Sequence, residues 1–221
     1  MSRNFSRSEL AFLVGIPAAW ATLLLFHPTG DTDGFYDVIE GNVTAWITVH
    51  IGMGIFVPLF AAGIFLLLRG VEGRAAMVSR IGLAFFAVLY AAWELLLGGG
   101  TGILANEVAS LPAAEQEIGR ELVESYADSG VLVALSAIGS VGLAAAVIGA
   151  VVALRAAYRL GWAPIVLMLL ALPLIAIHEP PFGPIGLGLF IAAILLFARE
   201  QSPTRAAGRT TLGQPVPAPP V

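Results

Sequence analysis

The chain has 221 residues, of which 58% are hydrophobic and only 12% are charged. A soluble domain carries roughly 25% charged residues, so this chain cannot cover one core with a polar shell in water. Lipid, in contrast, accepts apolar side chains on the outside of a protein.

The absence of cysteine excludes disulfides, thiol catalysis and cysteine-ligated metal sites. The net charge of −4 gives no reason to expect a nucleic-acid partner. The composition predicts an all-α integral membrane protein whose main partner is the lipid bilayer.

Six apolar segments predict the architecture, at about 9–26, 45–68, 77–98, 130–154, 161–178 and 183–198. A spanning helix needs about 20 residues, and the second, third and fourth segments meet this length comfortably. The last two are shorter, so four spans followed by a re-entrant pair are the alternative to six spans. We predict a six-helix transmembrane domain over residues 1–199, in which the first segment is retained rather than cleaved as a signal peptide.

The charges predict the orientation. Ten of the eleven basic residues, all arginines, fall before the first segment, after the second, after the fourth and after the sixth. Acidic residues dominate the alternate loops, where Arg120 is the remaining arginine. The positive-inside rule places the arginine-rich face, with both termini, in the cytoplasm. Because a lysine-free chain rich in alanine and glycine is typical of GC-rich genomes, we expect the inner membrane of a bacterium.

The largest outer loop lies between the third and fourth spans. Its glycine run, Gly98–Gly102, is interpreted as a flexible helix exit, and Ser110-Leu111-Pro112 is a plausible helix start. The following stretch predicts a short amphipathic helix with an apolar face formed by Ile118, Leu122, Val123 and Tyr126. Arg120 is expected to pair with acidic residues of the same helix.

Other segments predict packing, interfaces and a tail. Small residues along the fourth span, including Gly142 and Gly149, predict close helix contacts inside the bundle. Trp46, Tyr90 and Trp93 are expected near the outer membrane interface. Residues 200–221 are rich in proline and polar residues, which predicts a disordered cytoplasmic tail.

All three histidines fall at one predicted depth, with one carboxylate inside a span. His27 ends the first span, His50 lies one turn into the second and His178 ends the fifth. Glu94 lies about one turn below the outer end of the third. Catalytic zinc typically takes three protein ligands plus water, and imidazole also suits iron, manganese or copper. The pattern predicts an outward-facing pocket in which His27, His50 and His178 bind a divalent metal such as zinc. Glu94 is the predicted catalytic residue of a metal-dependent membrane enzyme acting near the outer leaflet.

The same residues are compatible with other functions. Histidine is common at helix ends, which gives His27 and His178 an ordinary structural explanation. A non-enzymatic scaffold or partner subunit, working with other proteins or as a homo-oligomer, is the main alternative. Two histidines can also ligate haem b in an electron-transfer or quinone-handling protein, and Glu94 suits a small transporter. His50 and Glu94 favour a functional site, because ionisable groups inside the hydrocarbon are costly and usually functional.

Fusion proteins test the predicted orientation. A C-terminal green fluorescent protein should be bright and a C-terminal alkaline phosphatase inactive, because the phosphatase requires disulfides that form only outside the cytoplasm. Each fusion is the control for the other. An active phosphatase together with a dark fluorescent protein would contradict a cytoplasmic C-terminus.

Overall fold

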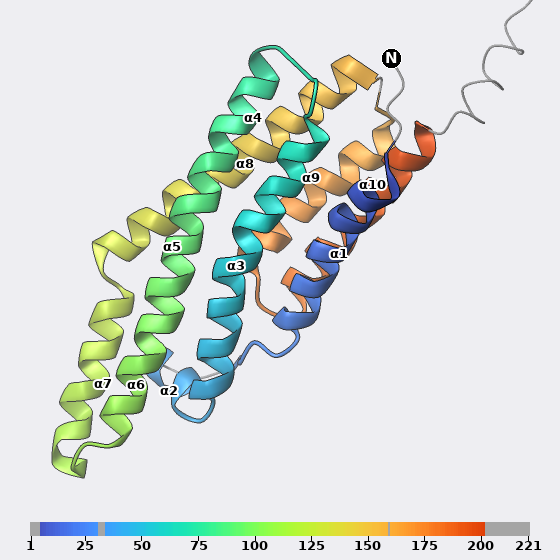
Figure 1. Ribbon diagram of the computed structural model, residues 1–221. Helices are drawn as coiled ribbons and strands as arrows, with labels where there is room; N and C mark the ends of the chain where they lie inside the picture. Colours follow the sequence, from blue (N-terminus) through green and yellow to red (C-terminus); the bar gives the residue numbers. More distant parts are fainter. Residues whose placement is uncertain (1–4, 31–33, 159, 202–221) are drawn as a thin grey trace, which may run out of the picture.

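The computed structural model describes residues 5–30, 34–158 and 160–201, and these residues form helices and no strand (Figure 1). The all-helical fold class is therefore confirmed for this part of the chain. From residue 202 onward, the tail predicted over 200–221 lies outside the described residues, and its disorder stays a prediction.

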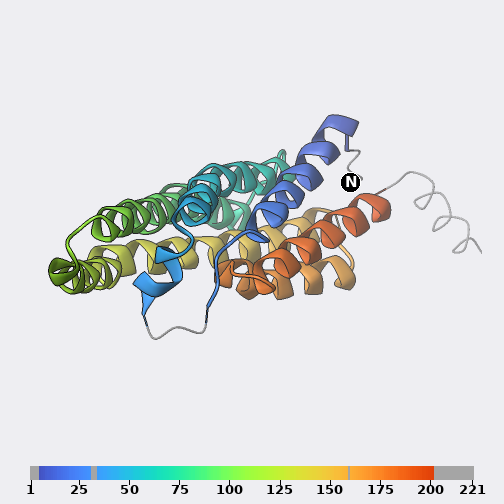
Figure 2. The same cartoon turned by 90° about the horizontal axis from the view of Figure 1, so that it is seen from below.

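The long helices of the described residues form six antiparallel rods (Figures 1 and 2). Four rods are single helices, namely α1 (Arg7–Leu24), α3 (Val43–Leu67), α9 (Trp162–Ile177) and α10 (Phe182–Glu200). The third rod along the chain is continuous and comprises α4 (Arg74–Phe85), η1 (Phe86–Tyr90), α5 (Ala91–Glu94), η2 (Leu95–Gly99) and α6 (Gly100–Ala109). The fourth comprises α7 (Ala113–Ala127) and α8 (Gly130–Tyr158), which a short break separates. The short helix α2 (Phe35–Glu40) precedes α3.

The rods form a closed ring around one apolar core. Each packs against two neighbours, in the order α1, α3, α4, α8, α9, α10 and back to α1. The core includes the fully buried rings of Trp20, Phe60 and Phe86. The outer surface is apolar as well, with Ile55 and Val141 more than half exposed. An apolar outer surface is suited to lipid rather than to water.

Four stretches of the described residues can cross a membrane by length and composition: Val43–Leu67, Arg74–Ala109, Ala113–Tyr158 and Phe182–Glu200. The helix α9 is apolar but has only 16 residues. At 1.5 Å per residue it is about 24 Å long, slightly less than a hydrocarbon layer of about 30 Å. A helical bundle with four candidate spanning helices is thus confirmed, while the count of six stays a prediction.

Charge distinguishes one end of the bundle. The starts of α1 and α4 and the ends of α3, α8 and α10 lie together (Figure 1), and we call this the arginine end. Arg7, Arg74 and Arg199 lie in these terminal turns.

Arg80 donates hydrogen bonds to the carbonyls of Leu68 and Val71, at 3.0 and 2.7 Å. A cation at this position stabilises the C-terminus of α3 through the helix dipole.

The third predicted span was wrong at its outer end. The segment expected to stop at residue 98 continues as a helix to Ala109, straight through the glycine run. At two of these positions, close contact with α3 leaves no room for a side chain. A Cβ on Gly98 would lie 1.9 Å from Cγ of His50, and one on Gly102 would lie 2.4 Å from Cγ1 of Ile47. The rod has 36 residues; its length of about 54 Å extends well beyond a hydrocarbon layer of about 30 Å.

The amphipathic helix predicted after residue 110 corresponds to α7, which forms a hairpin with α6 beyond the ends of α1, α9 and α10 (Figure 2). Its apolar contact face differs from the predicted one. Gly119 and Val123 are buried, whereas Ile118 and Leu122 are 70% and 60% exposed. The close contact in this hairpin leaves no room for a side chain at Gly119, because a Cβ there would lie 2.7 Å from the Val108 side chain of α6. The location of α7 outside the cell stays a prediction.

Arg120 joins α7 to α2 instead of pairing within its own helix. Its guanidinium nitrogens lie 3.2 Å from carboxylate oxygens of Asp37 and Glu40. The same group lies 4.9 Å from the centroid of the Tyr36 ring. Glu124 adds a link by accepting a hydrogen bond of 2.7 Å from the backbone N–H of Tyr36. These contacts hold α2 against the α6–α7 hairpin.

The small residues of α8 form its contact with α4. A Cβ on Gly142 would lie 2.9 Å from the carbonyl oxygen of Gly82, and Ser79 donates a buried hydrogen bond of 2.6 Å to the carbonyl of Ala146. The close approach expected from small residues is therefore present. The expectation that α8 lies inside the bundle was wrong, because its other face exposes 69% of Val141.

The α4–α8 contact predicts a stability difference between two glycine variants. Gly142→Ala should lower the free energy of unfolding by about 1–3 kcal/mol, because the new Cβ meets backbone atoms that cannot move independently. Gly188→Ala on α10 is the matched control, since no heavy atom lies within 4 Å of its Cβ position. The control should be neutral or stabilising by up to about 1 kcal/mol through helix propensity. Thermal unfolding in detergent measures both, and equal midpoints would contradict the packing argument.

Candidate metal centre

Helix lengths place four ionisable side chains in one layer of the bundle. From the arginine end, α1 and α9 are about 27 and 24 Å long and stop just before His27 and His178. His50 lies about 26 Å along α3 from Leu67, and Glu94 lies about 30 Å along the third rod from Arg74. The layer is therefore about one hydrocarbon thickness from the arginine end.

The structure brings the three histidines together. One possible ligand nitrogen from each of His27, His50 and His178 lies within 4.8 Å of those of the other two. The ring centroid of His27 is 5.0 Å from that of His50 and 5.3 Å from that of His178. The His50 and His178 centroids are 6.3 Å apart, and no member of the cluster is more than 8% exposed. Three separate elements thus converge on one buried point.

Backbone carbonyls orient two of the rings. Nδ1 of His27 lies 2.8 Å from the carbonyl oxygen of Pro28, and Nδ1 of His50 lies 2.8 Å from that of Trp46. A carbonyl only accepts, so Nδ1 carries the hydrogen in both rings and Nε2 carries the lone pair. Metal-binding histidines typically donate their second ring N–H in this way. Nε2 of His27 is buried and has no hydrogen-bond partner among the described residues. Its lone pair is therefore not used by a hydrogen bond within this part of the chain.

The turn between α9 and α10 holds His178. This residue is the C-cap of α9 and has a left-handed φ of 48°, which is uncommon for residues with a side chain. Tyr90 donates a hydrogen bond of 3.2 Å to the carbonyl of Ala176, and its hydroxyl oxygen lies 3.5 Å from Nδ1 of His178. A Cβ on Gly183 would lie 2.0 Å from the carbonyl oxygen of His178. Glycine at the start of α10 therefore permits the tight turn that directs this imidazole inward.

Glu94 is the acidic neighbour of the cluster. It is 0% exposed, and its Oε2 lies 3.9 Å from Nε2 of His50. Neither carboxylate oxygen has a hydrogen-bond partner within the described part of the chain. A buried ionised carboxylate is strongly destabilising unless a cation compensates it. Two π-helical segments, η1 and η2, flank the short helix that ends at Glu94, and such segments occur frequently at functional sites.

Aromatic residues enclose the histidines, a role that sequence analysis missed. Trp46 and Tyr90, expected at the membrane interface, are only 4% and 2% exposed. The Trp46 ring centroid lies 4.2 Å from that of His50 and 5.2 Å from that of His27. Its Nε1 donates a hydrogen bond of 3.2 Å to the buried hydroxyl of Thr101. The signal available in the sequence was the spacing of Trp46 and His50, which places both on one face of a helix.

His27 and His178, which lie just beyond the ends of α1 and α9, are neutral at physiological pH. Burial, with the nearby His27 and His50 rings, lowers the pKa of His178 to about 3. Burial also lowers the pKa of His27, against the opposing effects of the Pro28 carbonyl and Glu179. Neutral imidazole is the form that binds a metal ion. These two side chains are thus in their ligating form at neutral pH.

The donor set fits zinc. A tetrahedral ion with Zn–N bonds of about 2.0–2.1 Å holds its nitrogen ligands about 3.3 Å apart. Nitrogens within 4.8 Å of one another reach this separation by side-chain shifts of about 1 Å. Three imidazoles leave a fourth position. Glu94, 3.9 Å from His50, lies close enough to fill that position or to act on a water molecule bound there.

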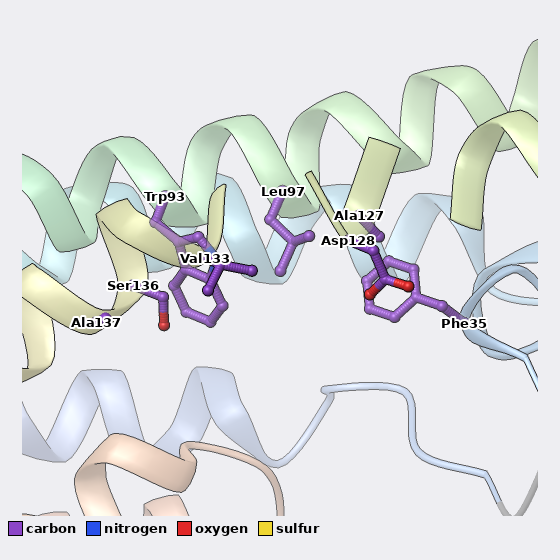
Figure 3. Close-up of a pocket in the computed structure, with 8 residues that line it drawn as sticks. All are labelled: Phe35, Trp93, Leu97, Ala127, Asp128, Val133, Ser136 and Ala137. Atoms are coloured by element: carbon purple, nitrogen blue, oxygen red, sulfur yellow. The ribbon is translucent and has the colours of Figure 1, made fainter. Parts of the chain in front are cut away.

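A cavity of about 360 Å³ lies beside the cluster, between the third rod, α2 and the break that separates α7 from α8 (Figure 3). It is lined mainly by apolar side chains, namely Phe35, Trp93, Leu97, Ala127, Asp128, Val133, Ser136 and Ala137. Trp93 lines the cavity, and its ring centroid is 5.9 Å from that of His178.

Comparison with known proteins gave no match to a protein-family model, a curated protein or a solved structure. The function of this chain is therefore argued from the geometry and chemistry of its own residues.

The packing of the third rod against His50 predicts the effect of two adjacent glycine variants on metal content. Gly98→Ala should displace the His50 ring and reduce bound zinc at least about tenfold, as losses around metal ligands typically do. Gly99→Ala is the control, because no heavy atom lies within 4 Å of its Cβ position. Zinc per chain in the two purified variants, measured by elemental analysis, checks the difference. Equal zinc contents would contradict the inferred dependence on His50.

Proposed function

We propose that this chain is a metal-dependent membrane enzyme that binds zinc through His27, His50 and His178. The convergence of these three buried imidazoles beside a fully buried carboxylate is the observation that supports it. Both the Nε2 atom of His27 and the oxygens of Glu94 lack hydrogen-bond partners among the described residues. Buried polar atoms without partners are costly, and a bound cation compensates the lone pair and the carboxylate together.

The chemistry that fits this donor set is hydrolysis of an ester or amide. A zinc ion held by His27, His50 and His178 would supply a Lewis acid that makes a water molecule easier to deprotonate. Glu94 acts as the general base and takes a proton as the water oxygen bonds to the substrate carbonyl carbon. The bond to the leaving group then breaks, and Glu94 returns the proton to the leaving oxygen or nitrogen. Water is consumed, and an acid and an alcohol or amine are released.

The depth of the cluster favours a substrate from the membrane. The positive-inside rule assigns the arginine end to the cytoplasm, so a layer about 30 Å away lies at the outer edge of the hydrocarbon. The linkages that join acyl chains to head groups lie at this edge. Six spans with both termini in the cytoplasm, in the inner membrane of a bacterium, are part of this proposal.

The geometry favours a single ion over haem b. A haem with two histidine ligands needs a flat slot as wide as the macrocycle between the imidazoles. Here the centroids of Trp46 and His178 lie 5.2 and 5.3 Å from that of His27. These rings occupy the space that a macrocycle between His27 and His50 would require.

Elemental analysis and activity together test this function. Protein purified without chelators should contain about one zinc ion per chain, and His50→Ala and His178→Ala should each lose most of it, because three ligands are needed to hold the ion. Glu94→Gln should retain zinc but lose about 10²–10⁴-fold in hydrolysis of a short-chain ester in detergent, as expected for loss of a general base. Glu107→Gln is the matched control, since Glu107 is exposed on the same rod.

Three outcomes would contradict the proposal. Zinc-free wild-type protein, or zinc contents that the histidine variants do not change, would favour the non-enzymatic scaffold. Loss of zinc in Glu94→Gln would make Glu94 a ligand of a closed structural site. A Soret band in the purified protein would replace zinc with haem.

A further inference from the structure

We propose that the cavity beside Trp93 binds an acyl ester or amide whose head group carries no phosphate or free carboxylate, taken from the outer leaflet. Its assignment as the substrate site rests on the proposed function, whereas binding itself does not. The volume of about 360 Å³ falls within the range of about 300–1,000 Å³ that is typical of small-molecule sites.

Two chains of ring contacts and one chain neighbour link the cavity to the histidines. The ring of Trp93 is 5.9 Å, centroid to centroid, from His178. Leu97 is followed by Gly98, which packs directly against the His50 ring. Phe35 is 5.1 Å from the ring of Trp46, which in turn contacts His50. The lining of the cavity is therefore connected to the candidate metal centre through one or two residues.

The cavity extends outward from the edge of the hydrocarbon layer. Counted along α8 from Tyr158, Ala137 lies about 32 Å from the arginine end and Gly130 about 42 Å, with Asp128 in the break just beyond Gly130. Figure 3 shows Asp128 and Phe35 at one end and Ser136 and Ala137 at the other, with Trp93 and Leu97 along the wall. An amphiphile from the bilayer would enter at the Ala137 end and direct its head group toward Asp128.

The lining determines the class of head group. Asp128 is exposed and supplies a carboxylate, and Ser136 supplies a hydroxyl. A carboxylate repels phosphate and free carboxylate groups but accepts hydrogen bonds from hydroxyl or amide groups. The apolar remainder of the lining accepts the first part of the acyl chain. The scissile bond then lies against Trp93, and that ring must turn to bring the bond to the histidines.

Photolabelling in nanodiscs tests the proposal with a monoacylglycerol that carries a diazirine near its ester. Labelled residues should lie in 93–97 and 133–137, and a tenfold excess of unlabelled monoacylglycerol should compete, whereas palmitate should not. Ala137→Phe, which fills the cavity, should reduce this labelling at least about fivefold. Ala134→Phe is the matched control, because Ala134 is exposed on α8 and does not line the cavity.

Labelling spread evenly over exposed residues such as Ile55 and Val141, without competition, would overturn the proposal. Equal competition by palmitate would overturn the exclusion of anionic head groups. The same measurement on His50→Ala separates this inference from the proposed function. Labelling that persists without zinc supports the cavity by itself, and zinc-loaded wild-type protein that is not labelled overturns the cavity alone.

Discussion

The burial of the Glu94 carboxylate is the constraint on which the centre of this molecule depends. Ionisation of a carboxyl group that is 0% exposed, with no hydrogen-bond partner among the described residues, is costly unless a cation lies nearby. Nε2 of His50 lies 3.9 Å from Oε2 of Glu94, and the possible ligand nitrogens of His27 and His178 lie within 4.8 Å of that of His50. Three lone-pair donors beside one buried acid form an environment for a cation rather than for an isolated side chain.

Unequal helix lengths create both the centre and the cavity beside it. The helices α1 and α9 end near the histidine layer and α10 begins there. The third rod continues beyond this layer, and α7 lies beyond it (Figure 2). The ends of the short helices deliver His27 and His178, and the longer rods form a cap over them. The break between α7 and α8 leaves the cavity open beside Trp93. One arrangement thus places a candidate metal centre and an apolar cavity at about the same level of the bundle.

Glycines provide the close contacts that hold this arrangement. Gly98 allows the third rod to lie against the His50 ring, Gly183 allows α10 to start against His178, and Gly142 allows α4 and α8 to cross. The first two lie directly at the histidines, so the small residues of this chain act on the site as well as on the packing. The unbroken rod through Gly98 shows why a glycine run does not by itself end a helix in a packed bundle.

The sequence by itself determined the helical class and the approximate positions of the long apolar helices, except for the outer end of the third rod. It also predicted that His27, His50, Glu94 and His178 lie in one layer. It could do so because the lengths of the apolar segments and the positions of the arginines can be read along the chain, and the rise per residue of an α-helix is constant. Only the tertiary structure decided that the three imidazoles meet within 4.8 Å, that Trp46 and Tyr90 enclose them and that Arg120 pairs with α2. These features depend on which helices become neighbours and on which face each turns inward, and a single sequence specifies neither through local periodicity.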